Sequence, residues 1–231
     1  HSLLAMRVIS AIQKELHVEL HIRDLFLNNT VEKLAHFVDA KEAAKAPAII
    51  VEERPARIPL SYAQERLWFI DQLHGSLQYH IPIVLKLTGT LHENALLQAF
   101  GQIVNRHEVL RTIFTEDQGI PFQKILTPKN WTADCLDGST FSEQELDDCI
   151  NTLVQKPFNL SKDLPLRLTL INRSKEVNVL VLVMHHIASD GWSNSILIDE
   201  FFHYYKAFVK EAAPTLPALA IQYADFAIWQ R

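Results

Sequence analysis

The sequence predicts an α/β fold preceded by a short all-α segment. Apolar residues recur at spacings of three to four between Leu3 and Leu16, as they do along one face of a helix. Beyond Ile58, helical patterns alternate with apolar runs of strand length. Residues 45–57 lie between these parts, contain prolines and show no periodicity. We therefore expect a helical domain at 1–44, a linker at 45–57 and an α/β domain at 58–231.

The first part is expected to hold two helices and one short helical turn. Ser2 stands where an N-cap or first-turn residue of the first helix belongs. The turn of helix is expected from His21 to Phe26. The first helix is striped by Leu3, Leu4, Val8, Ile12 and Leu16, and the last by Val31, Leu34, Phe37 and Val38.

The second part is expected to contain alternating helices and strands, with a central strand from Val177 to His185. That strand is apolar at successive positions, which indicates burial on both faces. A Gln118-Gly119 pair marks a hairpin, and Ser142-x-x-Glu145 is a capping box. The other expected elements are helices at 61–73, 93–104, 142–155 and 193–211 and strands at 81–87, 112–114, 121–126 and 167–171.

Composition excludes several classes of protein. The chain has 231 residues, 22 basic against 27 acidic, and its net charge of −5 argues against a nucleic-acid surface. Its longest apolar run, Val179 to Met184, is too short to span a bilayer. With only six glycines, it contains neither G-x-G-x-x-G nor G-x-x-x-x-G-K-[ST], the two standard phosphate-binding loops.

Cysteine usage and the start of the chain bear on its compartment. Two cysteines cannot form a disulfide framework, and no basic-then-apolar signal peptide opens the sequence. We therefore expect the reducing cytoplasm, and no oligomer is predicted.

The segment most suggestive of chemistry is residues 184–193, M-H-H-I-A-S-D-G-W-S. Adjacent strand residues point to opposite faces, so His185 and His186 cannot converge on one metal, and no metal site is predicted. This favours one histidine working in a cleft while the other packs. Two alternatives stay open: both histidines end a core strand, or Ser193, His186 and Asp190 form a hydrolase triad. The absence of G-x-S-x-G disfavours the triad.

The histidine segment resembles the signature of nonribosomal peptide synthetase condensation domains. Three further segments resemble other motifs of that family in the same order: S-Y-A-Q-E-R-L-W at 61–68, R-H-E-V-L-R-T-I-F at 106–114 and Y-A-D-F-A-I-W-Q at 223–230. The resemblance implies a two-lobed fold like chloramphenicol acetyltransferase, of which residues 58–231 are the first, N-terminal lobe.

The opening residues H-S-L-L resemble the end of the peptidyl carrier motif G-G-H-S-L. The resemblance implies that residues 1–44 are the C-terminal part of a carrier domain and that Ser2 carries 4′-phosphopantetheine. The alternative for Ser2 is an ordinary helix N-cap. The two interpretations are partly compatible, because a helix N-terminus favours a phosphodiester.

The resemblance also implies a reaction and a set of roles. The reaction is peptide-bond formation between a donor thioester and an acceptor amine, each held on a carrier. His186 is the expected catalytic histidine, and the Gly191 backbone N–H is a candidate oxyanion donor. His185 is expected to be structural, and Asp190 to form an ion pair with Arg106 or Arg111.

Partners and competing functions follow from the same resemblance. The expected partners are an upstream adenylation domain, a downstream carrier and a phosphopantetheinyl transferase. A histidine, rather than an aspartate, before Ser2 suggests an L-configured donor. The alternatives are a free-standing CoA-dependent acyltransferase and a non-catalytic docking module. Without a second lobe, this chain alone is expected to be inactive.

Overall fold

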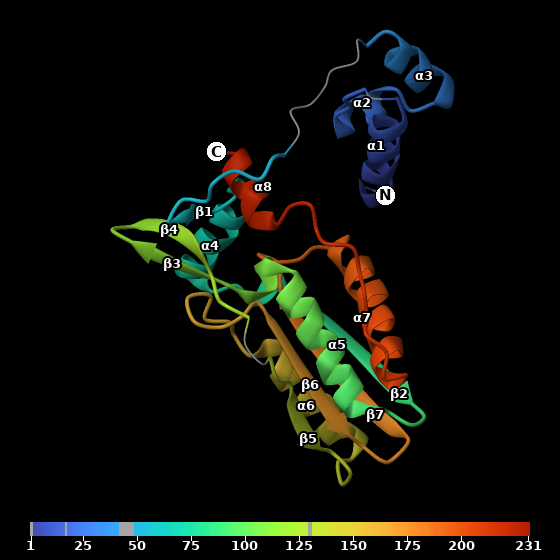
Figure 1. Cartoon of the computed structure of the whole chain (residues 1–231), viewed down its shortest axis with the longest axis vertical. Coiled ribbons are helices and arrows are strands. Elements are labelled where there is room, and N and C mark those ends of the chain that lie inside the picture. The colour runs from blue at the N-terminus through green and yellow to red at the C-terminus, as the bar shows by residue number, and fades with distance from the viewer. Residues whose placement is uncertain (1, 17, 42–48, 129–130) are drawn as a thin grey trace. The chain divides into compact units, whose positions relative to one another are not determined.

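The computed structural model describes residues 2–16, 18–41, 49–128 and 131–231. The chain falls into a front unit, His1–Ile49, and a main unit, Ile50–Arg231, each with its own hydrophobic core. The front unit is helical and the main unit is mixed α/β, which confirms the predicted fold class (Figure 1). His1 and residues 45–48 of the expected linker lie outside the described residues.

In its described residues, the front unit has three helices around a small core. The buried residues of this core are Ile9, Val18, Leu20 and Val38. The Thr30 hydroxyl caps the last helix by accepting a hydrogen bond from the Lys33 N–H at 3.3 Å. The helices are α1 (Ser2–Leu16), α2 (Ile22–Leu27) and α3 (Val31–Asp39), as the sequence predicted.

Helix α1 buries a different face from the one predicted. Ala5 and Ile9 are buried, and Ile12 packs partly against the core. Ala5 and Ile9 lie one residue step, or roughly 100°, around the helix from Leu4 and Val8, whereas Ile12 belongs to the predicted stripe as well as to the buried series. Periodicity alone could not separate the two series. The predicted stripe residues Leu4, Val8 and Leu16, and Val31 of α3, are exposed.

Strand β7 (Val177–His185) is the centre of the main unit. It pairs antiparallel with β2 (His80–Thr88) on one side and with β6 (Leu166–Asn172) on the other. Every residue from Asn178 to His185 is buried, which confirms the predicted central strand. Strand β5 (Asp134–Asp137) completes the sheet by pairing parallel with β6.

A second, three-stranded sheet has the order β1-β4-β3. The backbone turns between β3 and β4 through Gln118 and Gly119, both with positive φ, as the predicted hairpin requires. Strand β3 is three residues longer than predicted. The strands are β1 (Ile58–Pro59), β4 (Ile120–Ile125) and β3 (Thr112–Asp117).

Helices cover both faces of the larger sheet (Figure 1). Helices α5 (Glu93–Arg106) and α7 (Ser193–Val209) pack with Leu180, Leu182 and Met184 in one core cluster. The alternate residues of β7 belong to the opposite cluster, to which two other helices contribute. Those are α4 (Tyr62–His74) and α6 (Glu143–Gln155).

Three of the helices and strands described in the main unit, β1, β5 and α8, were not predicted. Strand β5 has the sequence D-C-L-D, too short and polar to show alternation, and its pairing with β6 defines it. Helix α8 (Tyr223–Trp229) follows Gln222, whose side chain forms a reciprocal cap with Asp225. Short 3-10 helices also occur at Leu77–Tyr79 (η1) and Glu108–Arg111 (η2).

Gly138 and Gly101 make a matched pair for testing the packing of this core. A Cβ on Gly138 would lie 2.6 Å from Cγ2 of Ile171, a fully buried core residue, whereas a Cβ on Gly101 of α5 meets nothing within 4 Å. We expect Gly138→Ala to lower the free energy of unfolding by about 1–3 kcal/mol through overpacking. Gly101→Ala should raise it by about 0.5–1 kcal/mol because alanine favours the helix.

Urea unfolding followed by tryptophan fluorescence measures both effects, because all four tryptophans lie in the main unit. A Gly138→Ala variant as stable as the unsubstituted chain would contradict this account of the core.

Candidate active site at the end of strand β7

The two histidines at the end of β7 lie in different environments. His185, the last strand residue, is fully buried, whereas His186 is exposed. The backbone N–H of His185 donates to Pro165 O at 3.0 Å, and that of His186 donates to Tyr79 O at 2.9 Å. Strand β7, which is buried on both faces, ends at His185, and His186 lies in the turn beyond it.

His185 is held as a neutral imidazole. Its Nδ1 accepts the Ile187 N–H at 3.0 Å, and its Nε2 lies 2.8 Å from Oγ of Ser76. Its ring meets those of Phe158 and His80 edge-on, with centroids 5.8 Å and 6.1 Å away. Burial, with smaller contributions in the same direction from the neighbouring His80 and His186, lowers the pKa of His185 to about 4.

His186 presents its ring at the surface beside Tyr79, with ring centroids 6.5 Å apart in an edge-on arrangement. An exposed imidazole at the end of a buried strand is accessible to a reactant from solvent. Within the described residues, no group of three His, Cys, Asp or Glu side chains is arranged to hold a metal ion. An imidazole at this position can act as a general acid or base.

Asp190 organises the turn that leads from the histidines into α7. Its Oδ1 accepts the Trp192 N–H at 3.0 Å, the Ser193 N–H at 2.9 Å and the Ser193 hydroxyl at 2.8 Å. Burial raises the pKa of this carboxyl, but these hydrogen bonds outweigh burial and leave the pKa below its ordinary value. Gly191 lies exposed in the same turn.

The expected ion pair between Asp190 and an arginine of the R-H-E motif is not formed in this structure. Arg106 Nε instead donates to Glu200 of α7 at 3.0 Å, and Arg111 Nη2 lies 3.5 Å from Glu108. Glu200 is buried and also accepts from His107 Nε2 at 2.7 Å. The physical reason is competition: Asp190 is already bound by donors at the start of α7, while buried Glu200 requires a cation.

Three of the four sequence motifs are joined by hydrogen bonds near this strand end. Gln64, which is buried, lies with its Nε2 3.5 Å from Ile187 O, in the histidine motif. Ser61 Oγ is 3.0 Å from the Tyr223 hydroxyl, which joins the first motif to the last. The motif residues of 61–68, 184–193 and 223–230 are thus brought together by direct side-chain contacts.

Several residues of this region were missed by sequence reasoning. Arg54 bridges two carboxylates, Glu108 at 2.7 Å and the buried Asp225 at 2.8 Å. Burial raises the pKa of Asp225, but hydrogen bonds from Arg54 and from the Gln222 backbone outweigh burial, so the pKa is lowered. Arg54 lies in a stretch without periodicity, so no local signal pointed to it.

Gln222, which precedes α8, binds the backbone of the R-H-E motif. Its Oε1 accepts the Glu108 N–H at 3.1 Å, and its Nε2 donates to Arg106 O at 3.0 Å. The R-H-E motif is therefore fixed by α7 through Glu200 and by α8 through Gln222.

Ser2 is the first residue of α1 in the front unit. Its position therefore meets the requirement for an anion at a helix N-terminus, where free N–H groups and the helix dipole favour negative charge. The first turn of this 15-residue helix contains no acidic residue that would repel a phosphate.

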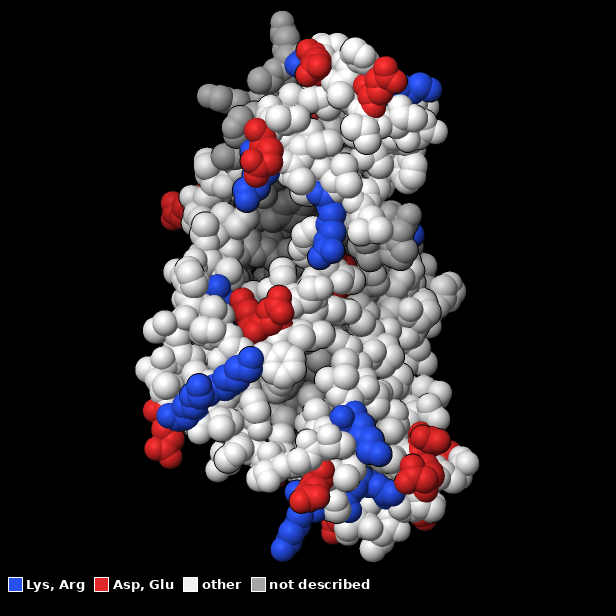
Figure 2. All heavy atoms as spheres, turned by 90° about the vertical axis from the view of Figure 1, so that its right-hand side faces the viewer, with Lys and Arg blue, Asp and Glu red and all other residues white. Residues whose placement is uncertain are grey.

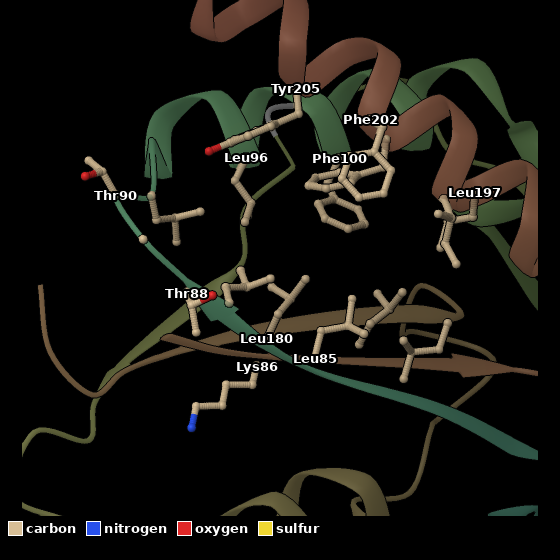
Figure 3. Close-up of a pocket in the computed structure, with 17 residues that line it drawn as sticks. Leu85, Lys86, Thr88, Thr90, Leu96, Phe100, Leu180, Leu197, Phe202 and Tyr205 are labelled. Carbon is tan, nitrogen blue, oxygen red and sulfur yellow. The ribbon is translucent and has the colours of Figure 1, made fainter. Parts of the chain in front are cut away.

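An apolar pocket of about 520 Å³ lies between β2, α5 and α7, toward the end of β2 that is remote from His80. Leu180, Phe100, Leu197, Phe202 and Tyr205 are among the side chains around it, while Lys86 points away (Figure 3). It contains neither histidine of the candidate site, so it supplies no group for the chemistry there.

Charges on the face of the molecule that carries α7 are mixed in sign. Figure 2 shows acidic and basic side chains in small, separate groups on this face, without a continuous basic patch among the residues described. No helix in the described part of the chain combines the length and apolar character needed to cross a membrane.

Comparisons with known proteins cover both units. The family model described as "Condensation domain" matches residues 55–231, and that described as "Phosphopantetheine attachment site" matches residues 1–38. The solved X-domain from teicoplanin biosynthesis is 31% identical, with a TM-score of 0.71 over 79% of this chain and 40% of that chain. The first condensation domain of the CDA synthetase, at 20% identity and a TM-score of 0.66 over 75% of this chain and 45% of that one, shows the fold alone.

Curated relatives are long enzymes of which this chain matches a small part. The dimodular nonribosomal peptide synthase of Bacillus subtilis (strain 168) is 40% identical over 100% of this chain and 10% of its own length. Malpinin synthetase of Mortierella alpina is 35% identical over 100% of this chain and 3% of its length. The chain therefore belongs to the condensation-domain family of nonribosomal peptide synthetases, with a phosphopantetheine-attachment segment in front of that domain.

Proposed function

We propose that the main unit forms peptide bonds between carrier-bound substrates, with His186 as its catalytic residue. The observation that carries this proposal is the exposed imidazole of His186 at the end of a strand whose preceding histidine is buried and neutral. The amine of an acceptor aminoacyl group attacks the carbonyl carbon of a donor thioester. A C–N bond forms, the C–S bond breaks, and the amine proton leaves with the thiol.

His186 contacts the attacking amine in this proposal. Its ring either takes the amine proton or orients the amine and stabilises the tetrahedral intermediate, and the two roles differ in the pH dependence of the rate. Because a thioester is already activated, no covalent intermediate on the protein is required. Positioning of the two reactants supplies much of the rate enhancement.

Gly191 is the proposed oxyanion donor through its backbone N–H. The carboxylate of Asp190 binds the next two N–H groups, those of Trp192 and Ser193, and this fixes the turn in which Gly191 lies. A glycine permits close approach of a substrate oxygen to the backbone. Asp190 and His185 are structural in this scheme, and so are Arg106, which binds Glu200 of α7, and Arg111, which pairs with Glu108 of its own motif.

Residues 1–44 are proposed as a carrier domain whose Ser2 holds 4′-phosphopantetheine, with residues 45–57 as the linker. When attached, this group supplies the thiol that bears the acyl substrate. The helix N-terminus at Ser2 supports this assignment because it suits a phosphodiester. A phosphopantetheinyl transferase, an upstream adenylation domain and a downstream carrier are the proposed partners, in the cytoplasm, with an L-configured donor.

The role of His186 is tested by His186→Ala in the full-length synthetase. Loss of a positioned acid–base group should lower the rate of dipeptide formation by about 100-fold or more, with carrier loading unchanged. Mass spectrometry of carrier-bound intermediates measures both steps. His203→Ala removes an exposed imidazole of α7 and serves as the matched control, expected to leave the rate unchanged. Equal rates in the two variants would eliminate His186 as the catalytic residue.

The assignment of Ser2 is tested by incubation with coenzyme A and a phosphopantetheinyl transferase. The unsubstituted protein should gain the mass of one phosphopantetheinyl group, and Ser2→Ala should gain none, because the acceptor hydroxyl is gone. Ser10→Ala, which alters an exposed serine of the same helix, should be modified normally. Modification of Ser2→Ala would place the attachment site elsewhere.

A further inference from the structure

A chain of polar side chains leads from buried His185 to the end of α4. His185 Nε2 lies 2.8 Å from Ser76 Oγ, and the Ser76 hydroxyl in turn contacts Oδ1 of Asp71. His185 is 0% exposed and Ser76 is 4% exposed, while Asp71 is half-buried. None of the four sequence motifs contains Asp71 or Ser76.

The direction of each hydrogen bond in this chain follows from its members. The Ile187 N–H can only donate, so Nδ1 of His185 must accept and carries no hydrogen. The ring hydrogen of a neutral imidazole therefore lies on Nε2, which donates to Ser76 Oγ. The Ser76 hydroxyl, having accepted from His185, is left to donate to the Asp71 carboxylate.

The segment that holds His185 also holds His186. Ser76 precedes the 3-10 helix η1, whose last residue, Tyr79, accepts the His186 N–H at 2.9 Å through its carbonyl. A hydrogen bond of 2.8 Å from the Tyr79 N–H to Ser76 O makes the segment one rigid turn. Gly75, with φ of +72°, allows the chain to leave α4 and place Ser76 under the ring of His185.

Among the described residues, Ser76 is the one whose side chain lies within hydrogen-bond distance of His185 Nε2, and the buried Nε2 of neighbouring His80 makes no hydrogen bond. On the sheet, His80 of β2 is its register partner, and the Nδ1 atom of His80 is directed to Val154 O at 2.8 Å. The ring of Phe158 covers another side edge-on. Ser76 and, behind it, Asp71 therefore supply the hydrogen-bond partner that a buried Nε2–H needs.

We propose that Asp71 and Ser76 are positioning residues that fix the tautomer and ring orientation of His185, and through the shared turn at 76–79 the position of His186. A buried donor without a partner is costly, so removal of the Ser76 hydroxyl favours a different tautomer or ring orientation of His185. The Ile187 N–H and the turn that carries His186 then lose their fixed geometry. The expected effect on condensation rests on the function proposed for His186. The assigned tautomer of His185 is independent of that function.

The tautomer is read directly by nitrogen NMR of the chain labelled at its histidines, with His185→Gln identifying the His185 signals. We expect His185 to show the Nε2–H tautomer at neutral pH. Ser76→Ala should shift these signals toward a tautomer mixture, and Thr152→Ala, which removes a hydroxyl from an exposed residue of α6, should not. An unchanged tautomer in Ser76→Ala would overturn the assignment.

The effect on the reaction is measured in the full-length synthetase. Ser76→Ala should lower kcat for dipeptide formation by about 10- to 100-fold, with KM for the loaded carrier unchanged, because displacement of a reacting group by about 1 Å has effects of this size. Asp71→Asn keeps an oxygen that accepts from Ser76 and should stay within about threefold of the unsubstituted enzyme, whereas Asp71→Ala should lose rate as Ser76→Ala does. Unchanged kcat in Ser76→Ala, or equal losses in the two Asp71 variants, would refute the positioning role.

Two further comparisons keep the outcomes distinct. If Ser76→Ala does not fold, as judged by tryptophan fluorescence, the comparison of Asp71→Asn with Asp71→Ala tests the same positioning role, because Asp71 is half-buried and its replacement perturbs the core less. If His186→Ala itself leaves the rate unchanged, the proposed function fails, whereas the NMR result still decides whether Asp71 and Ser76 fix His185.

Discussion

The burial of β7 on both faces is the constraint on which the rest of the main unit depends. Its residues alternate between two core clusters, with Leu180, Leu182 and Met184 on the side of α5 and α7, and Val179, Val181 and Val183 on the side of α4 and α6. Two such layers hold the strand rigidly, since interiors are close-packed and tolerate little displacement. The packed strand therefore fixes the backbone position of the residues at the end of β7, and with it the position of their side chains.

The same alternation, and the point at which the strand ends, give the two histidines different surroundings. His185 continues the series of Val181 and Val183, so it enters the cluster that contains Phe158 and that α4 and α6 cover. Since α4 lies on this side, the turn after it is the segment that reaches His185 through Ser76. His186 follows where the strand has ended and its ring is exposed. One residue step along the chain thus separates a buried structural imidazole from an accessible one.

Periodicity predicted most elements of the fold, because most of them bury one regular face or two. Periodicity failed where contacts with distant segments, rather than the local residue pattern, decide which residues are buried or paired. Two equally good apolar series exist on α1, and only packing against α3 and the segment after α1 selects Ala5 and Ile9. Strand β5 is defined by its partner β6 rather than by its own residues. The motif residues could be found from the sequence, but their partners could not: Arg54, Glu200 and Ser76 lie at distant positions without a local signal.

The neutrality of His185 has a consequence for the adjacent ring. A cation on His185 would repel a proton from His186 and so weaken His186 as a proton acceptor. Burial keeps His185 neutral at neutral pH, since it lowers the pKa of His185 to about 4. A buried histidine with a hydrogen-bond acceptor at Nε2 and a backbone donor at Nδ1 can satisfy both nitrogens without a charge. Ser76 therefore suits this position better than a carboxylate in direct contact would, because a carboxylate against the ring would favour the imidazolium and place the unwanted charge beside His186.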